Sequence, residues 1–186
     1  MIKIFDILFS FVLILFLSIP IMIICVIIYF DTKSSPIFFS NRVGINNIIF
    51  SMPKLRTMHK NTPQLATHLL INPSQYISKF GGFLRKYSID EIPQLFSVLK
   101  GDMSLFGPRP ALFNQYDLIS LREKHNIHCL KPGITGLAQV KLRDNTSIKN
   151  KVLIEKIYLK NYSFCFNLKI LFETFFVVIL KKNISH

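Results

Sequence analysis

The feature that most constrains this chain is an uncharged apolar run near its start. Residues Ile7 to Phe30 contain no charged side chain. As a helix this run would be about 36 Å long, at roughly 1.5 Å per residue, which exceeds the hydrocarbon core of a bilayer, about 30 Å thick. It is too long for the apolar region of a cleaved signal peptide, and no small-residue cleavage site follows it. The run therefore predicts a membrane anchor.

Two topologies fit this anchor, a single span and a re-entrant hairpin. Ser18 and Pro20 interrupt its middle, and Pro20 removes one backbone hydrogen bond and clashes with the preceding turn. Membrane helices tolerate such a proline, so the interruption alone does not decide between the two. Orientation is better determined, because only Lys3 and the amino terminus precede the run whereas many Lys and Arg follow it. The positive-inside rule then places the following domain in the cytoplasm in either topology.

The rest of the chain is basic and large enough for one domain. The 186 residues carry 23 Lys and Arg against 10 Asp and Glu, and half of them are hydrophobic. We expect an anchor over 1–33 and one cytoplasmic domain over 34–186. Nucleic-acid binding is not expected, because no known reader motif is present and a basic surface beside a membrane already faces anionic lipid. The three cysteines lack CxxC spacing and indicate a reducing compartment.

Local patterns predict an α+β domain that is mostly helical. Short β-rich runs at Ile37–Ser40 and Ile48–Ser51 flank a turn and predict a hairpin. Apolar residues at helical spacing predict three helices, over Gln75–Tyr87, Glu91–Leu99 and Leu112–Lys124. Thr62–Pro73 is expected to be a loop or weak helix, and Lys131–Gly136 a loop. Lys169 and Glu173 interrupt the apolar C-terminal segment, which favours an interfacial or packed helix over a second span.

Asp90 and Glu91 are the only adjacent acidic residues in the chain. Two neighbouring carboxylates repel each other unless a cation or a helix start stabilises them. Pro93 suits the first turn of a helix, which would surround the pair with free N–H groups and favour an anion such as phosphate. An alternative without catalysis is a capping box, with Ser88 as the N-cap and Glu91 at the third helical position.

Basic residues lie before and after this pair. They are Lys54, Arg56, Arg85, Lys100 and Arg109. A carboxylate that attacks phosphorus must approach an anion, and two unit charges 4 Å apart repel by roughly 4 kcal/mol at an effective dielectric constant of 20. Arginine forks and a bound Mg²⁺ can cancel that repulsion, and Mg²⁺ often takes only one or two protein carboxylates. One carboxylate could therefore attack while the other holds the metal.

The segment from Ser88 to Pro110 resembles the bacterial sugar transferases, the monotopic phosphoglycosyl transferases. Its elements are Ser-Ile-Asp-Glu-Ile-Pro-Gln-Leu, Lys-Gly-Asp-Met-Ser and Gly-Pro-Arg-Pro. Asn41-Arg42, Lys54 to Met58 and Lys131 to Val140 match the family as well. The resemblance covers nearly the whole chain, and the length is similar to the family's small form, which has the catalytic core without added membrane helices.

The resemblance implies transfer of a phosphosugar from a UDP-sugar to a polyprenyl phosphate such as undecaprenyl phosphate, with release of UMP. It implies Asp90 as the nucleophile of a covalent intermediate and Glu91 as the residue associated with Mg²⁺. The expected substrate-binding residues are Lys54, Arg56, Arg85, Pro108, Arg109 and Pro110. The family's anchor is a re-entrant helix broken at a Ser/Pro motif, which here is Ser18 and Pro20.

This reaction would be the first membrane step of bacterial glycan assembly, at the cytoplasmic face of the inner membrane, with downstream glycosyltransferases as candidate partners. The chain departs from the family pattern at Val43, Pro53, Ser97, Leu137 and Asn167. These departures leave the dyad and the arginines untouched, but they put the sugar preference and the efficiency in doubt. The alternative is a membrane-anchored relative that binds nucleotide sugars and is catalytically weak or inactive.

Overall fold

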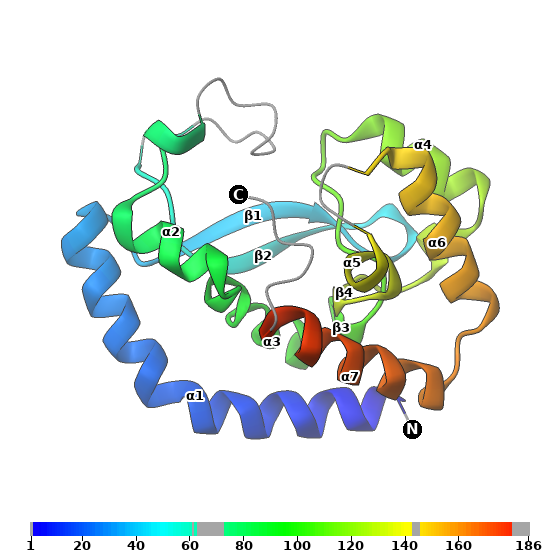
Figure 1. Ribbon diagram of the computed structural model, residues 1–186, viewed down its shortest axis with the longest axis horizontal. Coiled ribbons are helices and arrows are strands. Elements are labelled where there is room, and N and C mark those ends of the chain that lie inside the picture. The colour runs from blue at the N-terminus through cyan, green and yellow to red at the C-terminus, as the bar shows by residue number, and fades with distance from the viewer. Residues whose placement is uncertain (1, 61, 63–72, 143–145, 180–186) are drawn as a thin grey trace.

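The computed structural model describes residues 2–60, 62, 73–142 and 146–179 (Figure 1). A long N-terminal helix runs beneath and beside a domain of short helices with two small sheets. This confirms the expected mostly helical α+β architecture with an N-terminal apolar helix. The loop or weak helix predicted for Thr62–Pro73 lies almost entirely outside the described residues.

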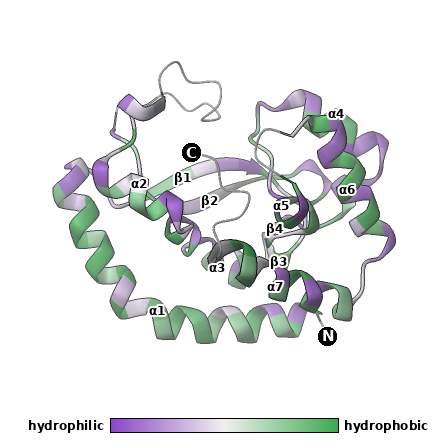
Figure 2. Cartoon of the chain, viewed as in Figure 1, coloured by the Kyte–Doolittle hydropathy of each residue, from purple (hydrophilic) through white to green (hydrophobic). Residues whose placement is uncertain are grey.

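The first helix, α1, spans Ile2–Thr32 and continues through Pro20. Figure 1 shows a pronounced bend along it, and Figure 2 shows that it is hydrophobic on nearly all sides. It is the one helix among the described residues that is long and apolar enough to cross a membrane. Ser18 donates a hydrogen bond to the Leu15 carbonyl (2.8 Å), which satisfies the serine within the helix. A proline commonly bends a helix in this way without ending it.

One side of α1 faces the domain on both sides of the bend. Its inward residues recur every three or four positions, as one helical face requires. They are Phe5, Asp6, Phe9, Ser10, Leu13, Ile14, Ile21, Ile24, Cys25, Ile28 and Thr32. Before the bend these residues pack against the core cluster that contains Leu95 and Phe106, and after it they pack against Leu55 and Leu84. The opposite side of α1 exposes large apolar residues such as Phe16, Ile19 and Phe30.

The predicted hairpin is confirmed. Strands β1 (Ile37–Val43) and β2 (Ile49–Leu55) pair antiparallel, with Arg42 opposite Phe50, so both strands are longer than the β-rich runs indicated. The turn η1 (Ile45–Asn47) places Asn46 and Asn47 at positive φ. Asparagine tolerates this left-handed backbone better than most residues, which explains the Asn-Asn pair at the turn.

The helices around the dyad are shorter than expected. Helix α2 spans Lys79–Lys86, after a turn η3 (Pro73–Gln75), and the Ser78 hydroxyl caps it by accepting from the Gly81 N–H (3.0 Å). The turn η4 (Ile89–Glu91) then precedes α3 (Gln94–Lys100). The capping-box interpretation is wrong, because Ser88 has a left-handed backbone (φ 55°) and its side chain makes no cap bond.

A second sheet was not predicted. Strand β3 (Ser104–Phe106) pairs parallel with β4 (Gly133–Thr135), so the segment Lys131–Gly136 is a strand in part and not only a loop. The Gly107 N–H extends this pairing to the Thr135 carbonyl (2.9 Å). Three-residue strands show no usable periodicity, and turn-forming residues dominate this segment.

The C-terminal part is helical and packs beside the second sheet. Its elements are α4 (Tyr116–Lys124), η5 (Ile127–Cys129), α5 (Leu137–Lys141), α6 (Ile148–Lys160) and α7 (Phe164–Ile179). Helix α7 confirms the helix expected from Phe164 onward. It packs against β3, β4 and α5, while Phe172, Phe175 and Phe176 are exposed.

The five departures from the family pattern occupy packing positions. Val43 packs beside the Ala111 cluster, and Leu137 belongs to the cluster around Tyr158. Ser97 and Asn167 are buried, and Asn167 accepts a hydrogen bond from the Tyr158 hydroxyl (2.9 Å). Pro53 lies in β2 opposite Phe39. Among the described residues, no side chain of these five hydrogen-bonds to Glu91.

Candidate active site

The Asp90–Glu91 dyad lies in the short turn η4 between α2 and α3. The core beneath it fixes that turn, since Ile89 packs against the cluster of Ile28, Leu55 and Leu84, and Ile92 packs against the cluster that contains Leu95. Asp90 is only 8% exposed. The two carboxylates are therefore held side by side in a largely desolvated setting, where electrostatic interactions are stronger than in water.

Glu91 is the centre of an ion-pair network. Lys54, near the end of β2, donates to Glu91 Oε1 (2.7 Å). Arg109 binds both oxygens as a fork, through Nη1 to Oε2 (3.2 Å) and Nη2 to Oε1 (2.5 Å). Burial alone would raise the pKa of Glu91, but the charges of Arg109 and Lys54 and the hydrogen bonds from both hold that pKa well below its usual range. Glu91 is therefore a fixed anion.

Asp90 has a different environment although it is the next residue. Among the described residues, Lys54 and Arg109 form their hydrogen bonds to the dyad with Glu91. Burial raises the pKa of Asp90, and the neighbouring Glu91 charge raises it further, against the opposing charges of Lys54, Arg109 and Arg85. The negative charge of Glu91 is thus balanced by its hydrogen-bonded partners. Asp90 is buried near the same positive charges without those hydrogen bonds.

The backbone that carries Arg109 is anchored on both sides. The Pro108 carbonyl accepts from the Gly133 N–H (3.0 Å), and the Pro110 carbonyl accepts from Arg42 Nη1 (3.3 Å). The next residue, Ala111, accepts from the Val43 N–H (2.9 Å). The segment from Pro108 to Pro110 is thus joined to both sheets. Such anchoring keeps the Arg109 fork at a constant position, as bidentate recognition of carboxylate or phosphate requires.

A buried ion pair supports the same segment from below. Arg122 on α4 donates to both oxygens of Glu155 on α6 (2.8 and 2.6 Å) and to the Arg109 carbonyl (2.9 Å). Arg122 is 7% and Glu155 2% exposed. These three bonds couple the packing of α4 and α6 to the backbone of a site residue. Neither Arg122 nor Glu155 was predicted, because nothing in their local sequence indicates the pairing.

Two other predicted substrate-binding residues, Arg85 and Arg56, differ in their position relative to the dyad. Arg85 on α2 lies within the field of the dyad; burial lowers its pKa, while the Asp90 charge acts in the opposite direction. Arg56 follows β2 and has other partners, since its Nε donates to the Ser35 carbonyl (2.7 Å) and its guanidinium stacks over the Phe38 ring (5.6 Å). The structure thus places Lys54, Arg85 and Arg109 around the dyad and Arg56 at the outer end of the hairpin.

Two further basic residues, Arg42 and Lys151, lie within the electrostatic influence of Arg109 and were not predicted as site residues from the sequence. Burial and the nearby Arg109 charge lower the pKa of Arg42 to about 10. Burial, together with the Arg122 charge, lowers the pKa of Lys151 on α6 to about 8, and Arg109 and Arg42 contribute. The Asn41-Arg42 match to the family was a usable signal for Arg42. No local signal marked Lys151.

The chain matches the family model described as "Bacterial sugar transferase" over residues 1–181. It belongs to the bacterial sugar transferase family. Among its relatives, the sugar transferase EpsL of Bacillus subtilis, named as uncharacterized, is 39% identical over 152 residues, which cover 81% of this chain and 74% of the relative. The galactosyl transferase CpsE of Streptococcus agalactiae is 38% identical over 156 residues, 77% of this chain and 34% of the relative.

A third relative is named for its lipid substrate. The undecaprenyl-phosphate galactose phosphotransferase of Salmonella typhimurium is 34% identical over 190 residues, which cover 94% of this chain and 40% of the relative. The chain therefore spans between a third and two fifths of the length of the Streptococcus and Salmonella proteins, and most of EpsL. For a bacterial sugar transferase, the acidic dyad and its cations are the natural candidate for the active site.

Proposed function

We propose that this sugar transferase moves a phosphosugar from a UDP-sugar to a polyprenyl phosphate and releases UMP. The observation that carries the proposal is the contrast within the dyad: Glu91 is bound by Lys54 and Arg109, whereas Asp90 is buried beside them without those bonds. The name of the Salmonella relative supports the lipid acceptor.

In the first step an Asp90 oxygen attacks the phosphorus that carries the sugar. The bond from that phosphorus to the bridging oxygen breaks, and the oxygen leaves with UMP. In the second step a phosphate oxygen of the lipid attacks the same phosphorus, which releases the Asp90 carboxylate and forms a lipid diphosphate sugar. Lys54, Arg85 and Arg109 offset the charge of the approaching diphosphate, while Glu91 keeps Lys54 and Arg109 in position.

The donor set also fits Mg²⁺, which prefers carboxylate oxygens and needs few protein ligands when phosphates and waters complete its shell. Glu91 Oε2 accepts one hydrogen bond in the described structure, from Arg109 Nη1, which leaves a lone pair for a metal. We propose Glu91 as the residue that would hold it. Mg²⁺ would supply electrostatic stabilisation of the departing phosphate.

We propose a re-entrant anchor with both ends of α1 at the cytoplasmic face of the inner membrane. The Ser104 hydroxyl donates to Asp6 Oδ2 (2.7 Å), and Ile28 packs against Leu55 and Leu84, so both halves of α1 contact the same domain. A single span would carry one half of α1 away from that domain. The apolar outer side of α1 and the exposed phenylalanines of α7 would then enter one leaflet.

Substitution of the nucleophile tests the reaction. Asp90→Asn keeps the side-chain size and should abolish UMP release by purified protein supplied with undecaprenyl phosphate and a panel of UDP-sugars. Glu123→Gln, on the exposed part of α4, is the matched control and should leave turnover unchanged. Release of UMP at the wild-type rate by Asp90→Asn would overturn the covalent assignment. No release by the wild type with any UDP-sugar would instead favour a binding-only relative.

The topology has its own test. A cysteine at Lys3, in a protein whose three native cysteines are replaced, should resist a membrane-impermeant thiol reagent on intact cells and react after permeabilisation. A cysteine at Lys33 is the matched control and should behave identically in the hairpin. Labelling of the Lys3 position from outside would show a single span and would contradict the re-entrant proposal, though not the chemistry.

A further inference from the structure

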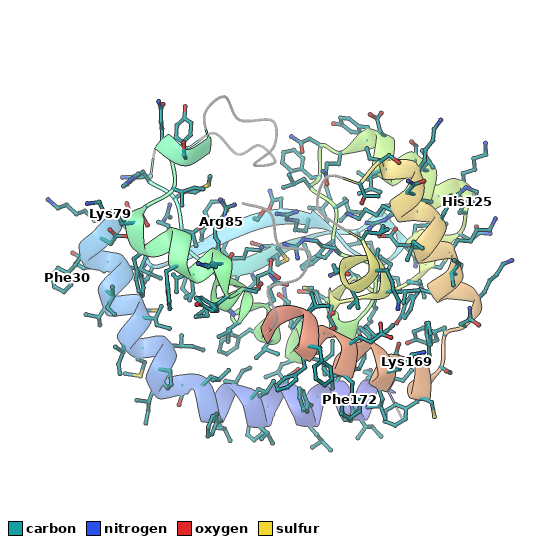
Figure 3. The ribbon with its side chains drawn as sticks, in the orientation of Figure 1. Phe30, Lys79, Arg85, His125, Lys169 and Phe172 are labelled. Carbon is teal, nitrogen blue, oxygen red and sulfur yellow. The ribbon has the colours of Figure 1, made fainter. Side chains whose placement is uncertain are left out.

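An open groove of about 760 Å³ separates the second half of α1 from α2. Val26, Ile27 and Phe30 line it from α1, and Phe80 and Phe83 line it from α2. Asp31 and Lys79 are its charged lining residues. Figure 3 shows Phe30 and Lys79 at the outer edge of the molecule, where α1 and α2 lie side by side, and Arg85 further in toward the hairpin.

An aromatic row leads from this groove toward the dyad. The Phe80 and Phe83 rings stack (5.9 Å between centroids), and Phe83 contacts Tyr87 (5.0 Å). Phe83 is 50% and Tyr87 37% exposed, so the row presents its rings to the outside. It ends at Tyr87, three residues before Asp90. The groove and the dyad also share one support, because Phe80 and Ile89 pack against the same cluster of Ile28, Leu55 and Leu84.

We infer that this groove and the aromatic row hold the first isoprene units of the acceptor lipid, with the lipid phosphate beside Arg85 and Asp90. The inference rests on the proposed function. The apolar lining suits a hydrocarbon chain, and the groove is continuous with the exposed apolar side of α1 that we place in the membrane. At the other end of α2, Arg85 offers the positive charge that a phosphate needs.

Exposed aromatic side chains in a membrane protein also contact ordinary lipid, so the test must separate the acceptor from the bilayer. Kinetics would compare undecaprenyl phosphate with a five-carbon prenyl phosphate, whose tail is a single isoprene unit and would leave most of the aromatic row and the groove unfilled. Both acceptors would be assayed in the same detergent, with the UDP-sugar that gives the highest turnover. Phe83→Ala is the test variant. Phe172→Ala on α7 is the matched control, since Phe172 is also exposed but lies outside the groove.

Phe83→Ala should raise the KM for undecaprenyl phosphate about tenfold, because loss of a phenylalanine contact removes at least the free energy of a tenfold affinity change. It should change the KM for the short acceptor and for the UDP-sugar less than twofold. Phe172→Ala should change none of these more than twofold. An unchanged KM for undecaprenyl phosphate in Phe83→Ala, or equal effects of the two variants, would overturn the inference. An inactive wild type would instead refute the proposed function itself.

A second measurement needs no variant. Wild-type protein would be irradiated with a prenyl phosphate that carries a benzophenone in its tail, and the labelled peptides identified by mass spectrometry. We expect label on α2 and on the second half of α1, reduced by excess undecaprenyl phosphate and not by phosphatidylglycerol. Label mainly on α7, or equal competition by both lipids, would assign the groove to bulk lipid and contradict the inference.

Discussion

Isosteric amide substitutions at the two adjacent carboxylates should differ in their effect on stability, because Glu91→Gln should destabilise the protein and Asp90→Asn should not. Glu91→Gln removes the negative charge that Lys54 and Arg109 bind. Removing one partner of a buried ion pair costs about 3–5 kcal/mol, because the other charge stays desolvated. The Arg109 side chain is 42% exposed and is partly screened by solvent, so we expect about 2–4 kcal/mol for Glu91→Gln.

Asp90→Asn should not destabilise the protein. Burial raises the pKa of Asp90, so the ionised carboxylate is less favourable in the folded protein than in the unfolded chain. Replacing it with a neutral amide should leave the stability at pH 7 unchanged or raise it. In a chain of this size, the loss expected for Glu91→Gln corresponds to a Tm lower by about 5–15 °C.

The assay is thermal unfolding in detergent at pH 7, followed by far-UV circular dichroism because the chain contains no tryptophan. The sign of the pH dependence gives a second check. The pKa of Glu91 is depressed in the folded protein, so its stabilising contribution is present above its unfolded pKa and is lost as the pH falls toward the folded value. The gap between the wild type and Glu91→Gln should therefore narrow in acid. Equal Tm values for the wild type and Glu91→Gln, or an equal loss in both variants, would refute this account of the dyad.

Two further predictions concern activity. Arg109→Lys keeps the charge but loses the planar fork, so kcat/KM for UMP release should fall at least tenfold. Near-wild-type activity would show that Arg109 contributes only its positive charge and not its bidentate geometry. As the proposed nucleophile, Asp90 must be ionised to attack, and burial raises its pKa above 3.8, the ordinary value for Asp. A plot of kcat/KM against pH should therefore fall in acid with a midpoint above 3.8. A midpoint at or below 3.8 would contradict the assignment of Asp90 as the nucleophile.

The sequence predicted the elements whose signal is local. The Asn-Asn turn and its flanking β-rich runs marked the hairpin, and the adjacent acidic residues marked the dyad. The capping box failed because Ser88 takes a left-handed backbone conformation in the turn after α2, where its side chain makes no cap bond. The parallel pairing of β3 with β4 and the Arg122–Glu155 pair join segments about thirty residues apart, which no local periodicity records.

Helix α1 shows most clearly which structural features could not be predicted from the sequence. Because α1 is apolar on nearly every side, its hydropathy cannot separate the side that faces lipid from the side that faces protein. Two polar residues do separate them. Asp6 and Ser10 are one turn apart on the same side of the helix, and both are buried against the domain. A carboxylate in such a helix is costly unless it has a partner, and here Ser104 supplies the partner.

It follows that the anchor is part of the folded domain and not a tether to it. Phe5, Phe9 and Leu13 complete the core that contains Leu95 and Phe106, and this core underlies the turn of the dyad. If the outer side of α1 rests in one leaflet, rigid packing between α1, α2 and α3 fixes the height of Asp90 relative to the lipid headgroups. A linker could not do this, because it would let the height vary. In the proposed reaction the acceptor phosphate stays at the membrane surface, and the packing of α1 against the domain would hold Asp90 at the height that this attack requires.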